Sequence, residues 1–199
     1  VIPAAATIIE EGSLLIVDEK GRDKGTMGGH IGNGDAGNDR PGRMRCLEAS
    51  FTLVGPDGTR SVKAGDFYEA AYMTEREDGE ILTHISFTAV EAGFAYEKQK
   101  RKIGDYATAA CAVLITKEGD KISSASVAMT NLSDVPVLSE AAGAALVGPS
   151  CDAAAMKAAV AAALEDSDPT EDNRGPVEFK MHVAGIIILR AIARAWSRA

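Results

Sequence analysis

The stretch from Gly25 to Asp39, which reads GTMGGHIGNGDAGND, constrains this chain more than any other part of it. Six of its fifteen residues are glycine, two are aspartate, and none is lysine or arginine. Glycine lets a backbone take up positive φ angles and approach a ligand closely, because it has no Cβ. Successive free N–H groups in such a turn can hold a phosphate without a cationic side chain. The segment is therefore typical of a cradle for a nucleotide diphosphate, with aspartate and asparagine side chains available for sugar hydroxyls.

The segment differs from the common phosphate loops. No Gly-Lys-Ser or Gly-Lys-Thr follows it, so it is not a P-loop. Its glycines are not spaced as GxGxxG, and no strand leads from it into a helix in the sequence pattern. On glycine content alone, a flexible surface loop is an equal alternative to a phosphate cradle.

Charge and residue spacing exclude several other functions. The net charge of −8 argues against general binding of nucleic acid, which favours basic surfaces. The longest apolar run, Ala184 to Leu189, is far too short to span a membrane. Neither the three cysteines nor the three histidines have metal-binding spacing, so we expect reduced, buried thiols and no metal site. Ser123 and Ser124 have no paired histidine, and we expect no catalytic residue in this chain.

Hydrophobic periodicity and turn signals predict a mixture of helices and antiparallel strands. Helices are expected at Ala4–Val17, Leu138–Leu146, Asp152–Leu164 and Gly175–Arg198. Strands are expected at Arg45–Val54, Arg60–Val62, Ile81–Thr88, Phe94–Lys98, Thr108–Thr116 and Lys121–Thr130. Two hairpin turns fall at residues 55–58 and 118–120, where Gly-Pro-Asp-Gly and Glu-Gly-Asp interrupt the apolar patterns.

The glycine-rich stretch, together with Pro41, resembles the second flavin-binding loop of the medium subunits of molybdenum hydroxylases. These are the FAD-binding subunits of the xanthine dehydrogenase and carbon monoxide dehydrogenase group. The family loop is similar to T-(I/V)-G-G-N, followed by a Ser/Asp-rich stretch that ends in Asp. The resemblance implies that FAD contacts Thr26, Met27, Gly28, Gly29, His30, Asn33 and Asp39. His30 stands where the family usually has Asn, and both side chains can hydrogen-bond.

A second stretch, Ala95 to Ala110, resembles the carbon monoxide dehydrogenase branch of this family. It reads AYEKQKRKIGDYATAA, and the resemblance places Tyr106 beside the flavin ring and makes Lys98 a flavin contact. An aromatic ring can stack on an isoalloxazine, which contributes about 1 kcal/mol. From the residues alone, Tyr106 also fits a half-buried strand tyrosine, and the basic residues at 98–102 also fit a solvated face.

The resemblance extends over nearly the whole chain and implies an α+β fold. Residues 1–92 are expected to form the C-terminal portion of an FAD-binding domain of the PCMH type. Residues 93–199 are expected to form a C-terminal domain with a three-stranded antiparallel sheet and helices. The family's medium subunit is longer, and its first glycine loop, which holds the other side of the FAD pyrophosphate, is absent from this sequence. We therefore expect residues 1–199 alone to bind FAD weakly.

The resemblance implies an FAD-dependent oxidoreductase subunit that passes electrons from iron–sulfur clusters through FAD to an external acceptor. Its expected partners are a large molybdenum–pterin subunit and a small subunit with two two-iron two-sulfur clusters, assembled as a dimer of heterotrimers. Aerobic oxidation of carbon monoxide in the cytoplasm is the favoured activity, with peripheral membrane contact through the electron acceptor. The alternatives are a medium subunit that serves aldehyde or N-heterocycle oxidation, and a docking subunit that has lost FAD.

Overall fold

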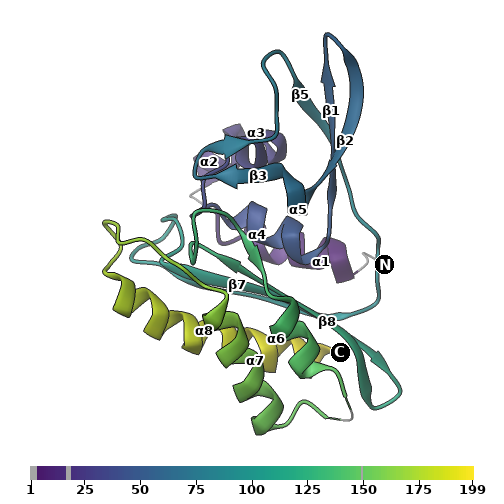
Figure 1. Cartoon of the computed structure of the whole chain (residues 1–199), viewed down its shortest axis with the longest axis vertical. Coiled ribbons are helices and arrows are strands. Elements are labelled where there is room, and N and C mark those ends of the chain that lie inside the picture. Colours follow the sequence, from purple (N-terminus) through teal and green to yellow (C-terminus); the bar gives the residue numbers. More distant parts are fainter. Residues whose placement is uncertain (1–3, 17–18, 149) are drawn as a thin grey trace.

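The computed structural model describes residues 4–16, 19–148 and 150–199. This part of the chain contains a four-stranded and a three-stranded antiparallel sheet, a two-stranded ribbon, and helices packed around them (Figure 1). The expected α+β class is confirmed. None of the described helices is both long enough and apolar enough to cross a membrane.

The four-stranded sheet lies at the centre of the described chain and has the strand order β6-β7-β8-β9. Its strands are β6 (Gly93–Gln99), β7 (Ala109–Glu118), β8 (Lys121–Thr130) and β9 (Val137–Leu138). Strands β7 and β8 are joined at Gly119, whose φ of 63° is readily adopted only by glycine. The predicted hairpin is therefore confirmed, and the two-residue strand β9 adds a fourth strand to the three that the sequence predicts.

Strand β7 is buried on both faces, because its side chains alternate between two cores. One core receives Ala109, Cys111, Val113 and Ile115. The other receives Ala110, Ala112 and Leu114. The strand is apolar without interruption because both faces of the sheet are covered there. A sheet with one solvent-exposed face would show polar residues at every second position.

Three helices cover one face of this sheet and close the first core (Figure 1). They are α6 (Glu140–Leu146), α7 (Ala153–Glu165) and α8 (Val177–Arg198). Ser139 caps α6 by accepting a hydrogen bond from the N–H of Ala142, and Asp152 caps α7 in the same way. All three helices begin within two residues of the starts that the sequence predicts.

Among the described residues, four short helices precede the sheets in the chain, and the first and fourth of them pack against the opposite face. They are α1 (Ala4–Ser13), α2 (Glu19–Lys24), α3 (Met27–Gly32) and α4 (Asp39–Cys46). Helix α1 confirms the helix predicted near the start of the chain, although it ends at Ser13 and Val17 lies outside the described residues. The prediction of a strand from Arg45 is wrong at its start, because Arg45 belongs to α4 and the strand begins at Ser50.

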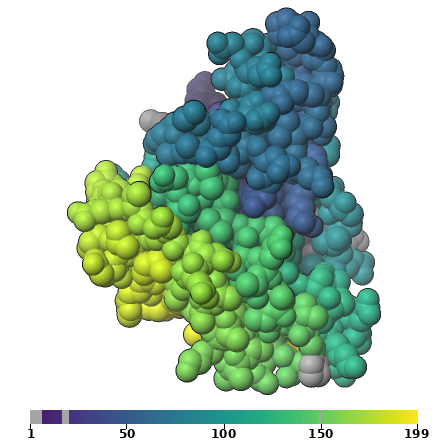
Figure 2. Space-filling view, viewed as in Figure 1, coloured from purple at the N-terminus to yellow at the C-terminus, as the bar shows by residue number. Residues whose placement is uncertain are grey.

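The three-stranded sheet extends away from the rest of the chain, as the blue strands at the top of Figure 1 show. Its order is β2-β1-β5, with β1 (Ser50–Gly55), β2 (Gly58–Lys63) and β5 (Ile81–Ser86). Between β2 and β5 the chain forms α5 (Ala64–Phe67), β3 (Tyr68–Ala70) and β4 (Met73–Thr74). Figure 2 shows the early, blue part of the chain lying against the green and yellow later part.

Candidate functional site

The glycine-rich stretch is more helical than the sequence suggests. Helix α3 begins directly after Thr26, whose Oγ1 accepts a hydrogen bond from the N–H of Gly29 at 3.0 Å. Gly28 and Gly29 lie inside this helix, and among residues 25–39 only Gly34 has a positive φ, of 63°. The prediction of a turn with positive φ angles at these two glycines is therefore wrong, because the threonine caps a helical turn there.

Space, rather than backbone freedom, explains Gly29 in α3. A Cβ at position 29 would lie 2.9 Å from Thr26 Oγ1, which is too close for the cap to remain. A Cβ at position 28 would lie 3.4 Å from the carbonyl oxygen of Leu82 on β5. The N–H groups of Met27 and Gly28 are in the first turn of the helix, so they have no acceptor within it. Gly29 thus leaves room for the Thr26 cap, and Gly28 lets α3 lie close to β5.

Asp39 begins α4 and is almost completely buried. Its Oδ1 accepts a hydrogen bond of 2.6 Å from the hydroxyl of Tyr96, and its Oδ2 lies 2.7 Å from Nζ of Lys98. The Lys98 side chain is only 1% exposed. Burial lowers the pKa of Lys98, and the charge of Asp39 opposes that shift. Two residues that the sequence analysis assigns separately to the cofactor therefore contact each other in the structure.

Arg43 lies beneath this pair and is fully buried, a feature that sequence reasoning misses. Its Nε donates to the carbonyl of Asp39 at 2.9 Å, and its Nη1 donates to the carbonyl of Ile9 on α1 at 2.8 Å. Its guanidinium carbon lies 5.0 Å from the ring centroid of Tyr96. A Cβ on Gly12 would overlap the guanidinium, so this glycine makes room for it. Burial lowers the pKa of Arg43.

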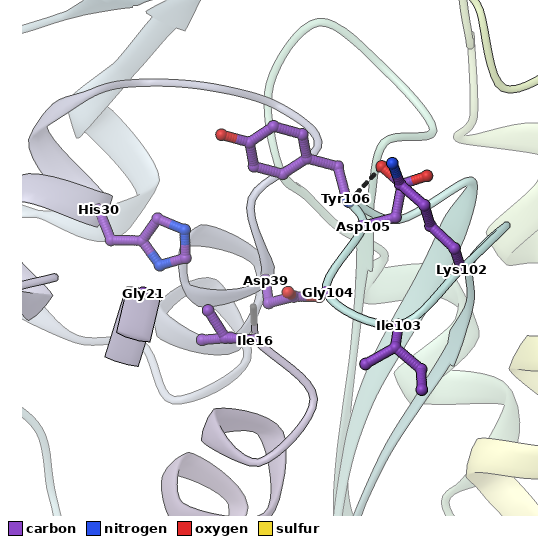
Figure 3. A pocket seen from close by; sticks show the side chains of 9 residues that line it. All are labelled: Ile16, Gly21, His30, Asp39, Lys102, Ile103, Gly104, Asp105 and Tyr106. Atoms are coloured by element: carbon purple, nitrogen blue, oxygen red, sulfur yellow. Dashed lines mark hydrogen bonds between the residues drawn. The ribbon is translucent and has the colours of Figure 1, made fainter. Parts of the chain in front are cut away.

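A cavity of about 450 Å³ opens above Asp39, between the early helices and the loop that follows β6 (Figure 3). One wall consists of Ile16, Gly21, His30 and Asp39, and the facing wall is the segment Lys102–Tyr106. The cavity thus brings together three residues that the sequence analysis assigns to the cofactor: His30, Asp39 and Tyr106. The other six, which are Thr26, Met27, Gly28, Gly29, Asn33 and Lys98, do not line it.

His30 reaches from α3 into this cavity. Burial and the positive charge of Arg40 lower the pKa of His30 below its ordinary value of 6.5, although Asp39 acts in the opposite direction. The imidazole is therefore neutral at pH 7 and can both donate and accept a hydrogen bond. Its Nδ1 is buried and has no hydrogen-bond partner among the described residues.

Tyr106 lies on the facing wall and keeps 40% of its surface exposed. Its backbone N–H donates to Oδ1 of Asp105 at 2.9 Å, and Asp105 pairs with Arg101 at 3.0 Å. The guanidinium carbon of Arg174 lies 5.2 Å from the centroid of the tyrosine ring. The ring therefore borders the cavity from a loop that is fastened by charged groups.

Several buried polar atoms around the glycine-rich segment lack partners. Four such atoms fall within residues 30–43 of the described chain: His30 Nδ1, Asn38 Oδ1, Arg40 Nε and Arg43 Nη2. Buried polar groups in proteins normally have a hydrogen-bond partner. Of these four residues only His30 lines the cavity, so its Nδ1 is the unpaired atom that a ligand in the cavity can reach. The combination of a cavity, an aromatic side chain on one wall and an unpaired imidazole nitrogen on the other fits a large, polar, aromatic cofactor such as FAD.

Two family models together match most of the chain. Residues 4–88 match the FAD binding domain in molybdopterin dehydrogenase, and residues 94–195 match the CO dehydrogenase flavoprotein C-terminal domain. These matches confirm the family that the glycine-rich and KRKIGDYATA motifs resemble.

Known proteins resemble the chain over its full length. The carbon monoxide dehydrogenase medium chain of Afipia carboxidovorans is 48% identical over all of this chain and 69% of its own length. The corresponding chain of Hydrogenophaga pseudoflava is 38% identical, with 70% of its length covered. Among solved structures, reconstituted CO dehydrogenase from Oligotropha carboxidovorans superposes with a TM-score of 0.96 at 48% identity, over all of this chain and 69% of that chain. Quinoline 2-oxidoreductase from Pseudomonas putida 86 gives a TM-score of 0.91 at 26% identity, over 97% and 68%.

Proposed function

Because this chain belongs to the FAD-binding subunits of the molybdopterin dehydrogenases, we propose that it serves the oxidation of carbon monoxide. It is a flavoprotein subunit of a molybdenum hydroxylase and therefore part of an oxidoreductase. The observation that carries the choice of carbon monoxide is the 48% identity to a carbon monoxide dehydrogenase medium chain along the entire chain. The glyceraldehyde dehydrogenase medium chain of Sulfolobus acidocaldarius is only 27% identical over a similar length, which makes an aldehyde the second candidate.

The proposed flavin site uses both walls of the cavity. Tyr106 offers a flat surface for the isoalloxazine, and neutral His30 offers a hydrogen-bonding edge opposite it. Thr26, Met27, Gly28 and Gly29 surround the capped start of α3, where the free N–H groups of Met27 and Gly28 suit the pyrophosphate. Asn33 lies at the other end of this helix, where its side chain is available to the cofactor. Asp39 forms the floor, and Lys98 acts by holding it in place. This assignment keeps all nine predicted residues but makes Lys98 a support of the site.

FAD, when bound, can accept and release electrons singly or in pairs. The protein supplies the orientation and the electrostatic surroundings of the cofactor. The residues of this chain contribute in three ways. The buried charges of Arg43, Lys98 and Asp39 leave one net positive charge below the cavity, which favours an anionic ligand. The cavity walls limit contact between the ring and water. The exposed loop at Lys102–Tyr106 borders the entrance through which an external acceptor approaches.

The wider assignment follows the same reasoning. We propose that residues 1–92 belong to the FAD-binding domain and residues 93–199 to the C-terminal domain. The proposed partners are a large subunit with molybdenum–pterin and a small subunit with two two-iron two-sulfur clusters, joined as a dimer of heterotrimers. The proposed location is the cytoplasm, with contact to the inner membrane face through the electron acceptor.

The test is to purify the native complex that contains this chain and to measure its flavin content and activity. We expect about one FAD for each copy of the chain and bleaching of its absorbance when carbon monoxide is added. A complex that bleaches with an aldehyde but not with carbon monoxide would contradict the proposed substrate. A complex without flavin would favour the docking-subunit alternative.

A further inference from the structure

A turn at Asp172–Gly175 lies next to the cavity loop, although it is distant in sequence from both glycine-rich and aromatic motifs. Its ends are joined by two backbone hydrogen bonds, from Asp172 N to Gly175 O at 3.3 Å and from Gly175 N to Asp172 O at 3.1 Å. Gly175 has a φ of 147°, which a residue with a side chain rarely adopts. The turn is therefore specified by its own sequence and does not depend on the cavity for its shape.

Charged groups fasten this turn to α8. Oδ2 of Asp172 lies 2.7 Å from Nη1 of Arg174 and 3.0 Å from Nζ of Lys180. The Lys180 side chain is only 2% exposed, and its Nζ also donates to the carbonyl of Thr170 at 2.7 Å. Burial would raise the pKa of Asp172, but the Arg174 N–H and the two cations bring it down to about 2. The aspartate is therefore ionised at every pH near neutrality and holds Arg174 in a fixed position.

Two contacts join the turn to the loop that carries Tyr106. The guanidinium of Arg174 lies over the tyrosine ring, with 5.2 Å from its carbon to the ring centroid. Arg101, which pairs with Asp105, donates to the carbonyl of Asn173 at 2.7 Å. Asp105 in turn accepts from the N–H of Tyr106, as the dashed line in Figure 3 shows. Both the backbone and the ring of Tyr106 are thus tied to the same turn.

We propose that Arg174 is a positioning residue for the flavin site, which acts by holding the ring of Tyr106 as one wall of the cavity. The inference rests on the proposed function, which places a flavin against the wall that contains Tyr106. Arg174 does not line the cavity itself, so its effect on the flavin passes through the tyrosine. A guanidinium attracts the face of an aromatic ring, and its planar shape suits stacking better than the ammonium of lysine does.

The experiment measures FAD affinity in the holoenzyme after reversible removal of its flavin. Arg174→Gln removes the cation and keeps a polar, though shorter, side chain. We expect the dissociation constant of FAD to rise roughly 2- to 5-fold, the size of one cation–π contact. We also expect the fluorescence of the bound flavin to increase, because a loosened tyrosine quenches it less. Arg174→Lys should give a smaller change in both measurements.

The decisive comparison repeats Arg174→Gln in a Tyr106→Ala background, where the arginine has no ring to hold. The effect of Arg174→Gln on FAD affinity should then fall below the error of the measurement. An undiminished effect would overturn the inference, since Arg174 would act without the tyrosine. Arg60→Gln is the matched control, because Arg60 forms carboxylate pairs on the projecting sheet, and it should leave FAD affinity unchanged.

The outcomes separate the two proposals. If Tyr106→Ala itself leaves FAD affinity and fluorescence unchanged, the flavin assignment of Tyr106 fails. If Tyr106→Ala weakens FAD binding while Arg174→Gln changes neither readout, only the positioning role of Arg174 fails.

Discussion

The two walls of the cavity are built in opposite ways. The wall from the early helices is fixed from below by buried groups, with Asp39 bound by Tyr96 and Lys98. The wall at Lys102–Tyr106 is exposed, and Ile103 at its tip is 87% exposed. Charged contacts at its end, rather than apolar packing, fasten it. We therefore expect the two walls to have different roles. The buried wall should stabilise the fold and contact the ligand, whereas the exposed wall should contact the ligand and let an electron acceptor reach it.

The largest expected effect comes from removing Asp39, the centre of the buried wall. Asp39→Ala leaves Lys98 and the Tyr96 hydroxyl buried without their acceptor. Breaking a buried ion pair at one partner costs about 3–5 kcal/mol, so the free energy of unfolding should fall by that amount. Urea denaturation measures it. Asp57→Ala, in the exposed turn between β1 and β2, is the control. If Asp39→Ala lowers the free energy of unfolding by less than about 1 kcal/mol, the buried wall does not stabilise the fold as the comparison of the two walls requires.

The second prediction concerns the fit between α1 and the buried arginine. Gly12→Ala places a Cβ where the Arg43 guanidinium lies, so one of the two must shift. We expect a loss of about 1–3 kcal/mol in the free energy of unfolding, as for other overpacked sites. Gly185→Ala is the matched control in α8, where the new Cβ would lie at ordinary contact distance, 3.6 Å from Leu164. That change should stabilise the helix by up to about 1 kcal/mol.

Combining the change with Arg43→Met tests the cause. Methionine has no guanidinium to displace, so Gly12→Ala should cost much less in that background. An equal cost in both backgrounds would mean that the strain lies elsewhere in α1.

Sequence reasoning predicts the sheets better than the site, and the two walls show why. The hairpins around Gly58 and Gly119 can be predicted because the residue types of four or five adjacent positions determine a turn. The pairing of Asp39 with Lys98 joins residues 59 positions apart and depends on where β6 lies against α4. No local pattern contains that information.

The burial of Arg43 and the short helix α3 escape sequence reasoning for different reasons. Arginine is rarely buried, so Arg43 reads as a surface residue until α1 and Gly12 are placed against it. Glycine disfavours helix, so GTMGGHIG reads as a loop, and the Thr26 cap outweighs that tendency. By contrast, the family resemblance assigns His30, Asp39 and Tyr106 to the cofactor, and the structure brings these three to one cavity.

The third prediction uses the lowered pKa of His30 on the buried wall. Burial and Arg40 favour the neutral imidazole in the folded chain, so below about pH 6.5 the unfolded chain binds a proton that the folded chain does not. Stability should therefore fall as the pH drops from 6.5 towards 5, by no more than about 1.4 kcal/mol per pH unit from this residue. His30→Asn should flatten that part of the profile, measured by urea denaturation at several pH values. An unchanged slope would show that His30 titrates alike in both states.

The smallest effect on stability should come from the exposed wall. Ile103→Ser removes an apolar side chain that the fold leaves in solvent, so almost no buried surface is lost. We expect the free energy of unfolding to stay within about 0.5 kcal/mol of the unchanged chain, in contrast to the several kcal/mol at Asp39. Any weakening of FAD binding by this variant then comes from the ligand-facing wall and not from loss of the fold. A loss of more than 1 kcal/mol in stability would instead show that the loop packs in the folded chain, and the contrast between the two walls would no longer hold.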